Sequence, residues 1–104
     1  MEIATVARPY AEALFQIAQK QDLTQWSQLI EALANIGSHP QVLEVANNPN
    51  LRKDQIAEIL FSIFRCENDE LVKNFIQVLV DNDRVSLLPE IAHQFEELKN
   101  ASQG

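Results

Sequence analysis

Hydrophobic residues recur at helical spacing along the whole chain of 104 residues, and no segment alternates cleanly between apolar and polar residues. The chain has only two glycines, Gly37 and Gly104, so neither dense hairpins nor glycine-rich phosphate loops are expected. Its length suits one domain, and 46% hydrophobic residues are enough for a packed core. These features predict an all-α fold, a single domain built as an antiparallel bundle of six helices.

The first three predicted helices are bounded by capping residues. The first covers about 5–20 and is expected to run through Pro9, because Ile3 already falls in the apolar arc that continues beyond the proline. Asp22 is the predicted N-cap of the second helix, and Gly37 closes that helix at its C′ position. A short third helix begins at residue 38 or 39, with Pro40 in its first turn, and ends at 46–50.

The other three helices follow after short breaks. Asn50 is the predicted N-cap of the fourth helix, about 51–64, and Asn68 that of the fifth. The fifth ends at 81–84, and the sixth runs over about 84–100 with Pro89 near its opening turns. Short connections of this kind are typical of antiparallel helical neighbours.

Three of the six helices, the first, fourth and fifth, have apolar faces as wide as roughly 200°. A domain of about 100 residues has few positions that are surrounded on all sides, so at least one exposed apolar groove is expected. The first helix has two apolar flanks of different size. If its alanine flank packs inward, its other flank lies nearer the surface. The alanine flank is Ala4, Ala7, Ala11 and Ala18, and the other flank is Val6, Tyr10, Ala13 and Ile17.

Charge and reactive residues argue against several classes of function. The net charge is −7, from 15 acidic and 8 basic residues, which disfavours nucleic acid and anionic lipid as partners. The single cysteine, Cys66, allows no internal disulfide, and neither His39 nor His93 has a second ligand at metal-binding spacing. Glu96 and Glu97 point about 100° apart on a helix, so they are expected to be solvated and not a catalytic pair. Neither an enzymatic activity nor a cofactor or metal is expected.

Membrane insertion and secretion are not expected from the sequence either. No apolar run approaches the ~18 residues of a membrane span. The first residues, MEIATVARP, lack the basic leader and apolar stretch of a secretory signal. Any role at a membrane would therefore need another protein to hold this chain there.

Two stretches carry a resemblance to a known family. TVARPYAEALFQIA (5–18) resembles the N-terminal signature of the delta subunit of bacterial F-type ATP synthases, the counterpart of the mitochondrial oligomycin-sensitivity-conferring protein. FIQVLVDNDRVSLLPEIAHQF (75–95) resembles the second recognisable stretch of that family. Together with Trp26, the two matches cover nearly the whole chain. Asp83 is a departure, because the family often has glycine after the asparagine at this turn.

The resemblance implies a non-catalytic stator subunit. In that family, a six-helix N-terminal domain sits at the crown of the catalytic head and binds the amphipathic N-terminal segment of an alpha subunit between its first and fifth helices. A C-terminal domain joins the b subunits of the peripheral stalk, so that rotor torque drives catalysis. Residues 1–104 are accordingly expected to be the N-terminal domain without the stalk-binding domain. The expected location is peripheral, on the cytoplasmic side of the bacterial inner membrane.

The resemblance, taken with the apolar faces, predicts the residues that bind the alpha segment. Tyr10 is the expected hot spot, and Ala13 is small enough for the partner helix to approach closely. A free-standing helical adaptor, such as a death-domain-like module, and a small enzyme are the alternative classes. The predicted walls of the groove are Val6, Tyr10, Ala13 and Ile17 on the first helix and Leu71, Phe75 and Val78 on the fifth, with Asn74 and Asn82 as a polar rim.

Overall fold

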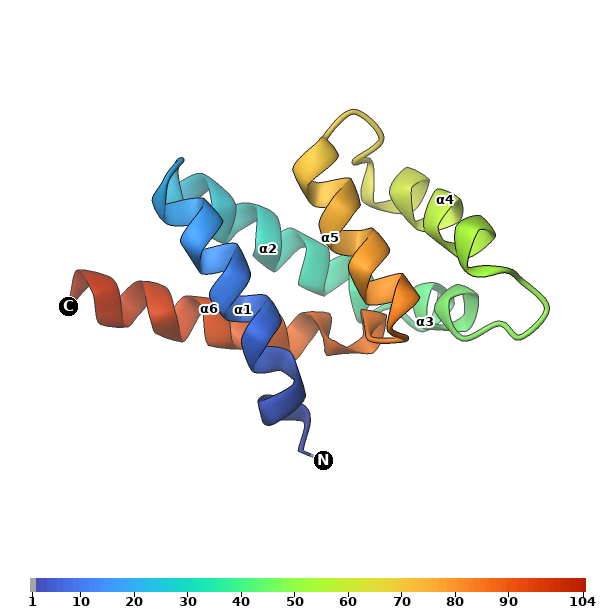
Figure 1. Cartoon of the computed structure of the whole chain (residues 1–104), viewed down its shortest axis with the longest axis horizontal. Helices are drawn as coiled ribbons and strands as arrows, with labels where there is room; N and C mark the ends of the chain where they lie inside the picture. The colour runs from blue at the N-terminus through green and yellow to red at the C-terminus, as the bar shows by residue number, and fades with distance from the viewer. Residues whose placement is uncertain (1) are drawn as a thin grey trace. The chain divides into compact units, whose positions relative to one another are not determined.

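The computed structural model describes residues 2–104, and all regular secondary structure in that range is helical. The helices are α1 (Ile3–Gln19), α2 (Leu23–Gly37), α3 (Pro40–Ala46), α4 (Lys53–Phe64), α5 (Glu70–Asp81) and α6 (Leu88–Gln103), with a 3₁₀ turn, η1 (Val85–Leu87), before α6 (Figure 1). The predicted all-α fold with six α-helices is therefore confirmed for the described residues.

The helices group into two compact units. The first unit consists of Met1–Asn35 and Leu87–Gly104, and so contains α1, most of α2 and α6. The second unit consists of Ile36–Ser86 and contains α3, α4 and α5.

In the first unit, α1 packs across α6 (Figure 1). Ala7, Ala11 and Ala18 are completely buried, as predicted for the alanine flank, because small side chains let two helical backbones approach closely. Ala4 departs from that prediction: it lies in the first turn of α1, ahead of the buried segment, and is exposed. The Phe15 ring meets the buried Phe95 ring edge to face, with the centroids 5.9 Å apart.

Pro9 lies inside α1, which begins at Ile3, two residues earlier than expected. The sequence predicted that the helix would run through the proline, and this is confirmed. Because proline has no N–H, the carbonyl of Thr5 loses the donor that an α-helix would supply from position 9. The first turn of α1 is therefore joined to the rest of the helix by one bond fewer than usual.

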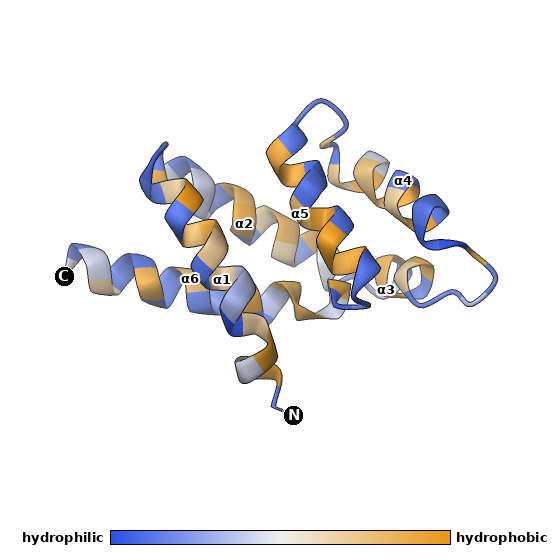
Figure 2. Cartoon of the chain, viewed as in Figure 1, coloured by the Kyte–Doolittle hydropathy of each residue, from blue (hydrophilic) through white to orange (hydrophobic). Residues whose placement is uncertain are grey.

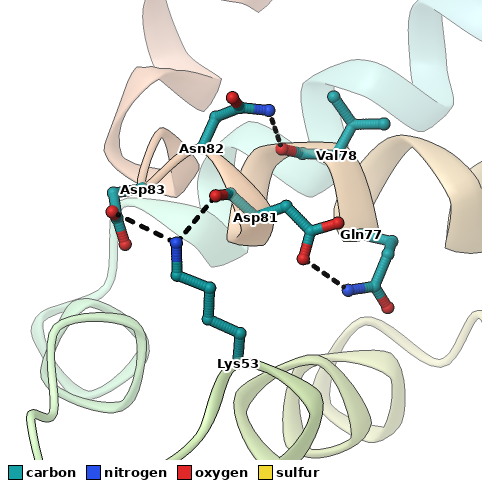
Figure 3. Close-up of polar contacts among 6 residues, drawn as sticks. All are labelled: Lys53, Gln77, Val78, Asp81, Asn82 and Asp83. Carbon is teal, nitrogen blue, oxygen red and sulfur yellow. Dashed lines mark hydrogen bonds and ion pairs between the residues drawn. The ribbon is translucent and has the colours of Figure 1, made fainter.

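In the second unit, α4 and α5 form an antiparallel pair joined by a short loop. At the start of α4, the Lys53 ammonium donates to the carbonyl oxygen of Asp81 at 2.7 Å and lies 3.5 Å from an Asp83 carboxylate oxygen (Figure 3). A positive charge there stabilises the C-terminal end of α5, where the last carbonyl groups have no helical N–H donors. Farther along the pair, the Lys73 ammonium lies 5.4 Å from the centre of the Phe61 ring.

Both helices of this pair end in the same motif, with a residue in the left-handed conformation. Arg65 (φ 56°) follows α4 and Asp83 (φ 57°) follows α5. The next N–H in each case reaches back five residues: Cys66 N donates to the carbonyl of Phe61 at 3.0 Å, and Arg84 N to that of Leu79 at 2.7 Å. These are Schellman motifs, which usually place glycine at the left-handed position. Asp83 therefore has the backbone conformation that glycine adopts most readily.

Two of the predicted N-caps lie elsewhere. The N-cap of α4 is Arg52, whose backbone N–H donates to the Gln55 side chain at 2.9 Å, and not Asn50. Asn50 instead donates its own N–H to the Asn48 side chain within the preceding turn. The N-cap of α5 is Asp69, not Asn68, and its carboxylate accepts the N–H of Val72 at 3.2 Å.

Gly37 is the last residue of α2 and is buried; no glycine among the described residues has a positive φ, so Gly37 is not a left-handed C′ residue. The predicted N-cap of α2 is confirmed, because Asp22 accepts the N–H of Gln25 at 3.0 Å. The third helix begins at Pro40, slightly later than predicted; His39 is its N-cap and accepts the N–H of Gln41 at 3.4 Å.

Candidate functional site

An accessible apolar strip runs along α1 beside its buried face. It consists of Val6, Tyr10, Ala13 and Ile17, and is called here the Tyr10 strip. Ala13 is exposed and the other three are half-buried. At 100° per residue the four positions share an arc of about 60°, roughly a quarter-turn from the centre of the buried face. The helix therefore packs one apolar face against α6 and has a second apolar face that is partly accessible. Ile3, which is 62% exposed, extends the strip toward the N-terminus.

A second strip runs along α5. It consists of Leu71, Asn74, Phe75, Val78 and Asn82, and is called here the Val78 strip. Leu71 and Val78 are 41% and 44% exposed, Asn74 and Asn82 are exposed, and Phe75 is half-buried. The buried face of α5 lies on another side and consists of Val72, Ile76, Leu79 and Val80. Figure 2 shows apolar and polar residues alternating along α5, as expected for a helix whose faces differ.

The polar end of the Val78 strip is fixed by hydrogen bonds within the second unit. The Asn82 amide nitrogen donates to the Val78 carbonyl at 2.8 Å, and Gln77 donates to the Asp81 carboxylate at 2.9 Å (Figure 3). Asn82 thus caps the helix with its amide nitrogen, which leaves its side-chain oxygen as the group suited to meet an external donor. Together with the Lys53 contacts, these bonds hold the last turn of α5 in one geometry.

All nine residues predicted for the site retain some exposure, and the structure gathers them into one strip on each helix. Sequence reasoning missed other exposed apolar residues. Ile59 and Ile63, each 37% exposed, lie one turn apart on α4. The wide apolar face of this helix was visible in the sequence, but its residues were not separated into buried and exposed ones. Ile3 was counted in the apolar arc of α1 without being assigned to the site.

A polar cluster in the first unit joins α2 to α6. The buried Ser27 hydroxyl donates to the Glu96 carboxylate, and the Lys99 ammonium lies 3.3 Å from the same hydroxyl and 3.6 Å from Glu96. Glu96 is therefore not simply solvated, and the prediction to that effect is wrong: its carboxylate packs against α2. Glu97 is exposed, as expected, and lies 3.3 Å from His93.

Two titratable groups have pKa values shifted by their surroundings. Burial raises the pKa of the Cys66 thiol, and the nearby Glu67 and Asp69 carboxylates add to that effect. The side-chain hydrogen bond from Arg52, at 3.1 Å, lowers the pKa of the exposed Asp54 carboxyl.

Within residues 2–104 no three His, Cys, Asp or Glu side chains are grouped so as to hold a metal ion.

The first unit also has a shallow cavity of about 280 Å³ between α1 and α6, lined by Arg8, Gln94, Glu97, Leu98 and Ala101. None of the described helices combines the length and the apolar character that crossing a bilayer requires.

Comparison with known proteins agrees with the resemblance seen in the sequence. The sequence model of the family described as "ATP synthase delta (OSCP) subunit" matches residues 6–104. The chain is 50% identical over 105 residues to "ATP synthase subunit delta" of Burkholderia pseudomallei and of Burkholderia thailandensis. Each match covers 99% of this chain, and the chain spans 59% of the length of each relative. This chain belongs to the ATP synthase delta (OSCP) subunit family.

Proposed function

We propose that this chain is a non-catalytic part of the ATP synthase stator, which binds the amphipathic N-terminal helix of an alpha subunit and so links the catalytic head to the peripheral stalk. Two observations support the proposal. The family match covers residues 6–104, and α1 and α5 each present an accessible apolar strip beside a separate buried face. The strips are the stronger support, because accessible apolar faces of this kind are typical of binding surfaces.

In the proposed mode of binding, the alpha helix contacts the Tyr10 strip and the Val78 strip together, as an amphipathic helix does in a hydrophobic groove. The spacing within each strip suits a helical partner. Val6, Tyr10, Ala13 and Ile17 recur every three or four residues, and so do Leu71, Asn74 or Phe75, Val78 and Asn82. A straight partner helix can follow such a row over several turns.

Individual residues have different parts in this proposal. The Tyr10 ring supplies a large, rigid contact area, the usual property of a hot spot. Ala13 is exposed and small, so a partner backbone can approach α1 at that point. Val78 and Leu71 bury area on binding because they are more than a third exposed without a partner. Asn74 and the side-chain oxygen of Asn82 form the polar rim, where hydrogen bonds set the register of the bound helix.

The proposed attachment to the stalk rests on the family resemblance. Because this chain spans 59% of the relatives it matches, the proposed contact with the b subunits is assigned to the part of those proteins beyond the match. Residues 2–104 then supply the contact with the head. In the complete complex, torque from the rotor is resisted at these two contacts, and the proposed position is peripheral to the cytoplasmic side of the bacterial inner membrane.

The test is a calorimetric titration of this chain with a synthetic peptide of the alpha-subunit N-terminal segment. Tyr10→Ala should weaken binding by about 5- to 150-fold, the usual range for a hot spot. Val78→Ala should weaken it by about three- to fivefold, because the two lost methyl groups are only partly exposed in the free chain and bury only that part of their area on binding.

Ile59→Ala on α4 is the matched control, since its side chain is similarly exposed but lies on neither strip. It should leave the affinity unchanged. Equal affinities for Tyr10→Ala and the unsubstituted chain, with both folded by circular dichroism, would remove Tyr10 from the site. Failure of the unsubstituted chain to bind would reject the proposed function.

A further inference from the structure

The side chain of Gln94 on α6 is one of two buried polar side chains among the described residues, at 6% exposure. Its amide nitrogen donates to the backbone carbonyl of Ala4 at 2.8 Å and to the carboxylate of Glu90 at 2.9 Å. Ala4 is 90 positions away in the sequence, in the first turn of α1. A buried amide therefore connects the middle of α6 to the start of α1, within one unit.

The orientation of this amide is fixed by its partners. Both partners, a carbonyl oxygen and a carboxylate, are acceptors, so only the NH₂ group of Gln94 suits the position it occupies. A rotated amide would bring its own oxygen against two acceptors and leave it without a donor in a buried site. The hydrogen bond to Ala4 is therefore a specific connection.

The start of α1 needs such a connection. Residues 2–5 are all exposed, and the first buried residue of the helix is Ala7. Pro9 removes the N–H that would have bonded to Thr5, so the first turn is also held less firmly by the helix itself. Ile3 and Val6 lie before Pro9, whereas the rest of the Tyr10 strip, from Tyr10 to Ile17, lies after it.

We propose that Gln94 is a positioning residue for partner binding: its hydrogen bond to the Ala4 carbonyl aligns the first turn of α1, so that Ile3 and Val6 continue the Tyr10 strip across the proline. The hydrogen bond from Gln94 to the Ala4 carbonyl is called here the tether. The effect on binding rests on the proposed function, whereas the tether itself does not. Gln94 is buried and lies outside the Tyr10 strip. It acts through the direction of the backbone that carries Ile3 and Val6.

The tether is tested by amide hydrogen exchange on Gln94→Met. Methionine has a similar shape and no donor, so packing is retained while the hydrogen bond is lost. The amides of Val6, Ala7 and Arg8, which bond back into the first turn, should exchange about five- to tenfold faster. The amides of residues 11–18, beyond the proline, should keep their rates.

Affinity for the alpha-subunit N-terminal peptide tests the consequence for binding. Gln94→Met should weaken it by about three- to tenfold, because a smaller fraction of molecules has the first turn aligned. Ser27→Ala is the matched control. It also removes a buried hydrogen bond to α6, but from the α2 side. This control should lower thermal stability and leave both the affinity and the exchange of the first turn unchanged.

Pro9→Ala provides a second, independent test, since alanine restores the N–H that can bond to Thr5. In that background Gln94→Met should change exchange and affinity by less than twofold. Unchanged exchange at Val6–Arg8 in Gln94→Met, an equal loss of affinity in Ser27→Ala, or a full effect of Gln94→Met in the alanine background would each overturn the inference. If the unsubstituted chain does not bind the peptide, the proposed function fails, while the exchange data still decide whether the tether exists.

Discussion

Replacing Arg65 with glycine should stabilise the protein, because Arg65 occupies a left-handed position at the end of α4 (φ 56°). That conformation costs an ordinary L-residue about 1–2 kcal/mol. Glycine adopts it freely, but the unfolded chain gains conformational entropy, which opposes the effect by about 0.5–1 kcal/mol. The net gain expected for Arg65→Gly is therefore about 0.5–1 kcal/mol. For a chain of this size, that gain corresponds to a rise in melting temperature of about 2–8 °C.

The assay is thermal and urea unfolding followed by circular dichroism, with Arg65→Ala as the control. Both variants remove the same exposed charged side chain, so their difference isolates the backbone contribution. Arg65→Ala should be within about 0.5 kcal/mol of the unsubstituted protein, as for most surface substitutions. If Arg65→Gly is no more stable than Arg65→Ala, the left-handed conformation at this position carries no strain and the reasoning is refuted.

Three further predictions concern other positions. Asp83→Gly should stabilise the protein by less than Arg65→Gly in the same unfolding assay, because it relieves the same backbone strain but also removes the ion pair with Lys53. An equal or larger gain would mean that this ion pair contributes nothing to stability. Pro9→Ala should raise the free energy of unfolding by about 1–3 kcal/mol, since alanine restores a helical donor, and a loss of stability would show that the proline suits its position. Cys66 should resist alkylation by iodoacetamide until the pH exceeds the ordinary thiol range, because burial raises the pKa of its thiol. The neutral thiol stabilises the folded state below that range, and this contribution is lost as the pH rises through the pKa of the folded protein. Rapid alkylation of the folded protein near pH 8 would contradict the burial.

The helices themselves could be predicted from the sequence because their apolar periodicity is strong. Asp22 and Pro40 marked helix starts correctly, since each has one obvious cap or first-turn role. The starts of α4 and α5 were misplaced by one or two residues. Several polar residues occur together there, and the direction in which the backbone enters each helix decides whether Arg52 or Asn50 becomes the cap.

The accessible strips could be predicted in part. On α1, the run of alanines indicated which flank packs inward, and Ala7, Ala11 and Ala18 are buried accordingly. The connection from Gln94 to Ala4 could not be predicted, because it spans 90 positions and depends on how α1 crosses α6. The contact of Glu96 with Ser27, 69 positions apart, was missed for the same reason.

Amide chemical shifts can show whether one partner helix contacts both the Tyr10 strip and the Val78 strip, as proposed. The ¹⁵N-labelled chain is titrated with the alpha-subunit N-terminal peptide, and shifts are mapped onto residues 2–104. Saturable changes are expected along both strips with the same dissociation constant, and little change is expected around Ile59 and Ile63 on α4. Changes restricted to one strip, or centred on α4, would contradict the proposed contact.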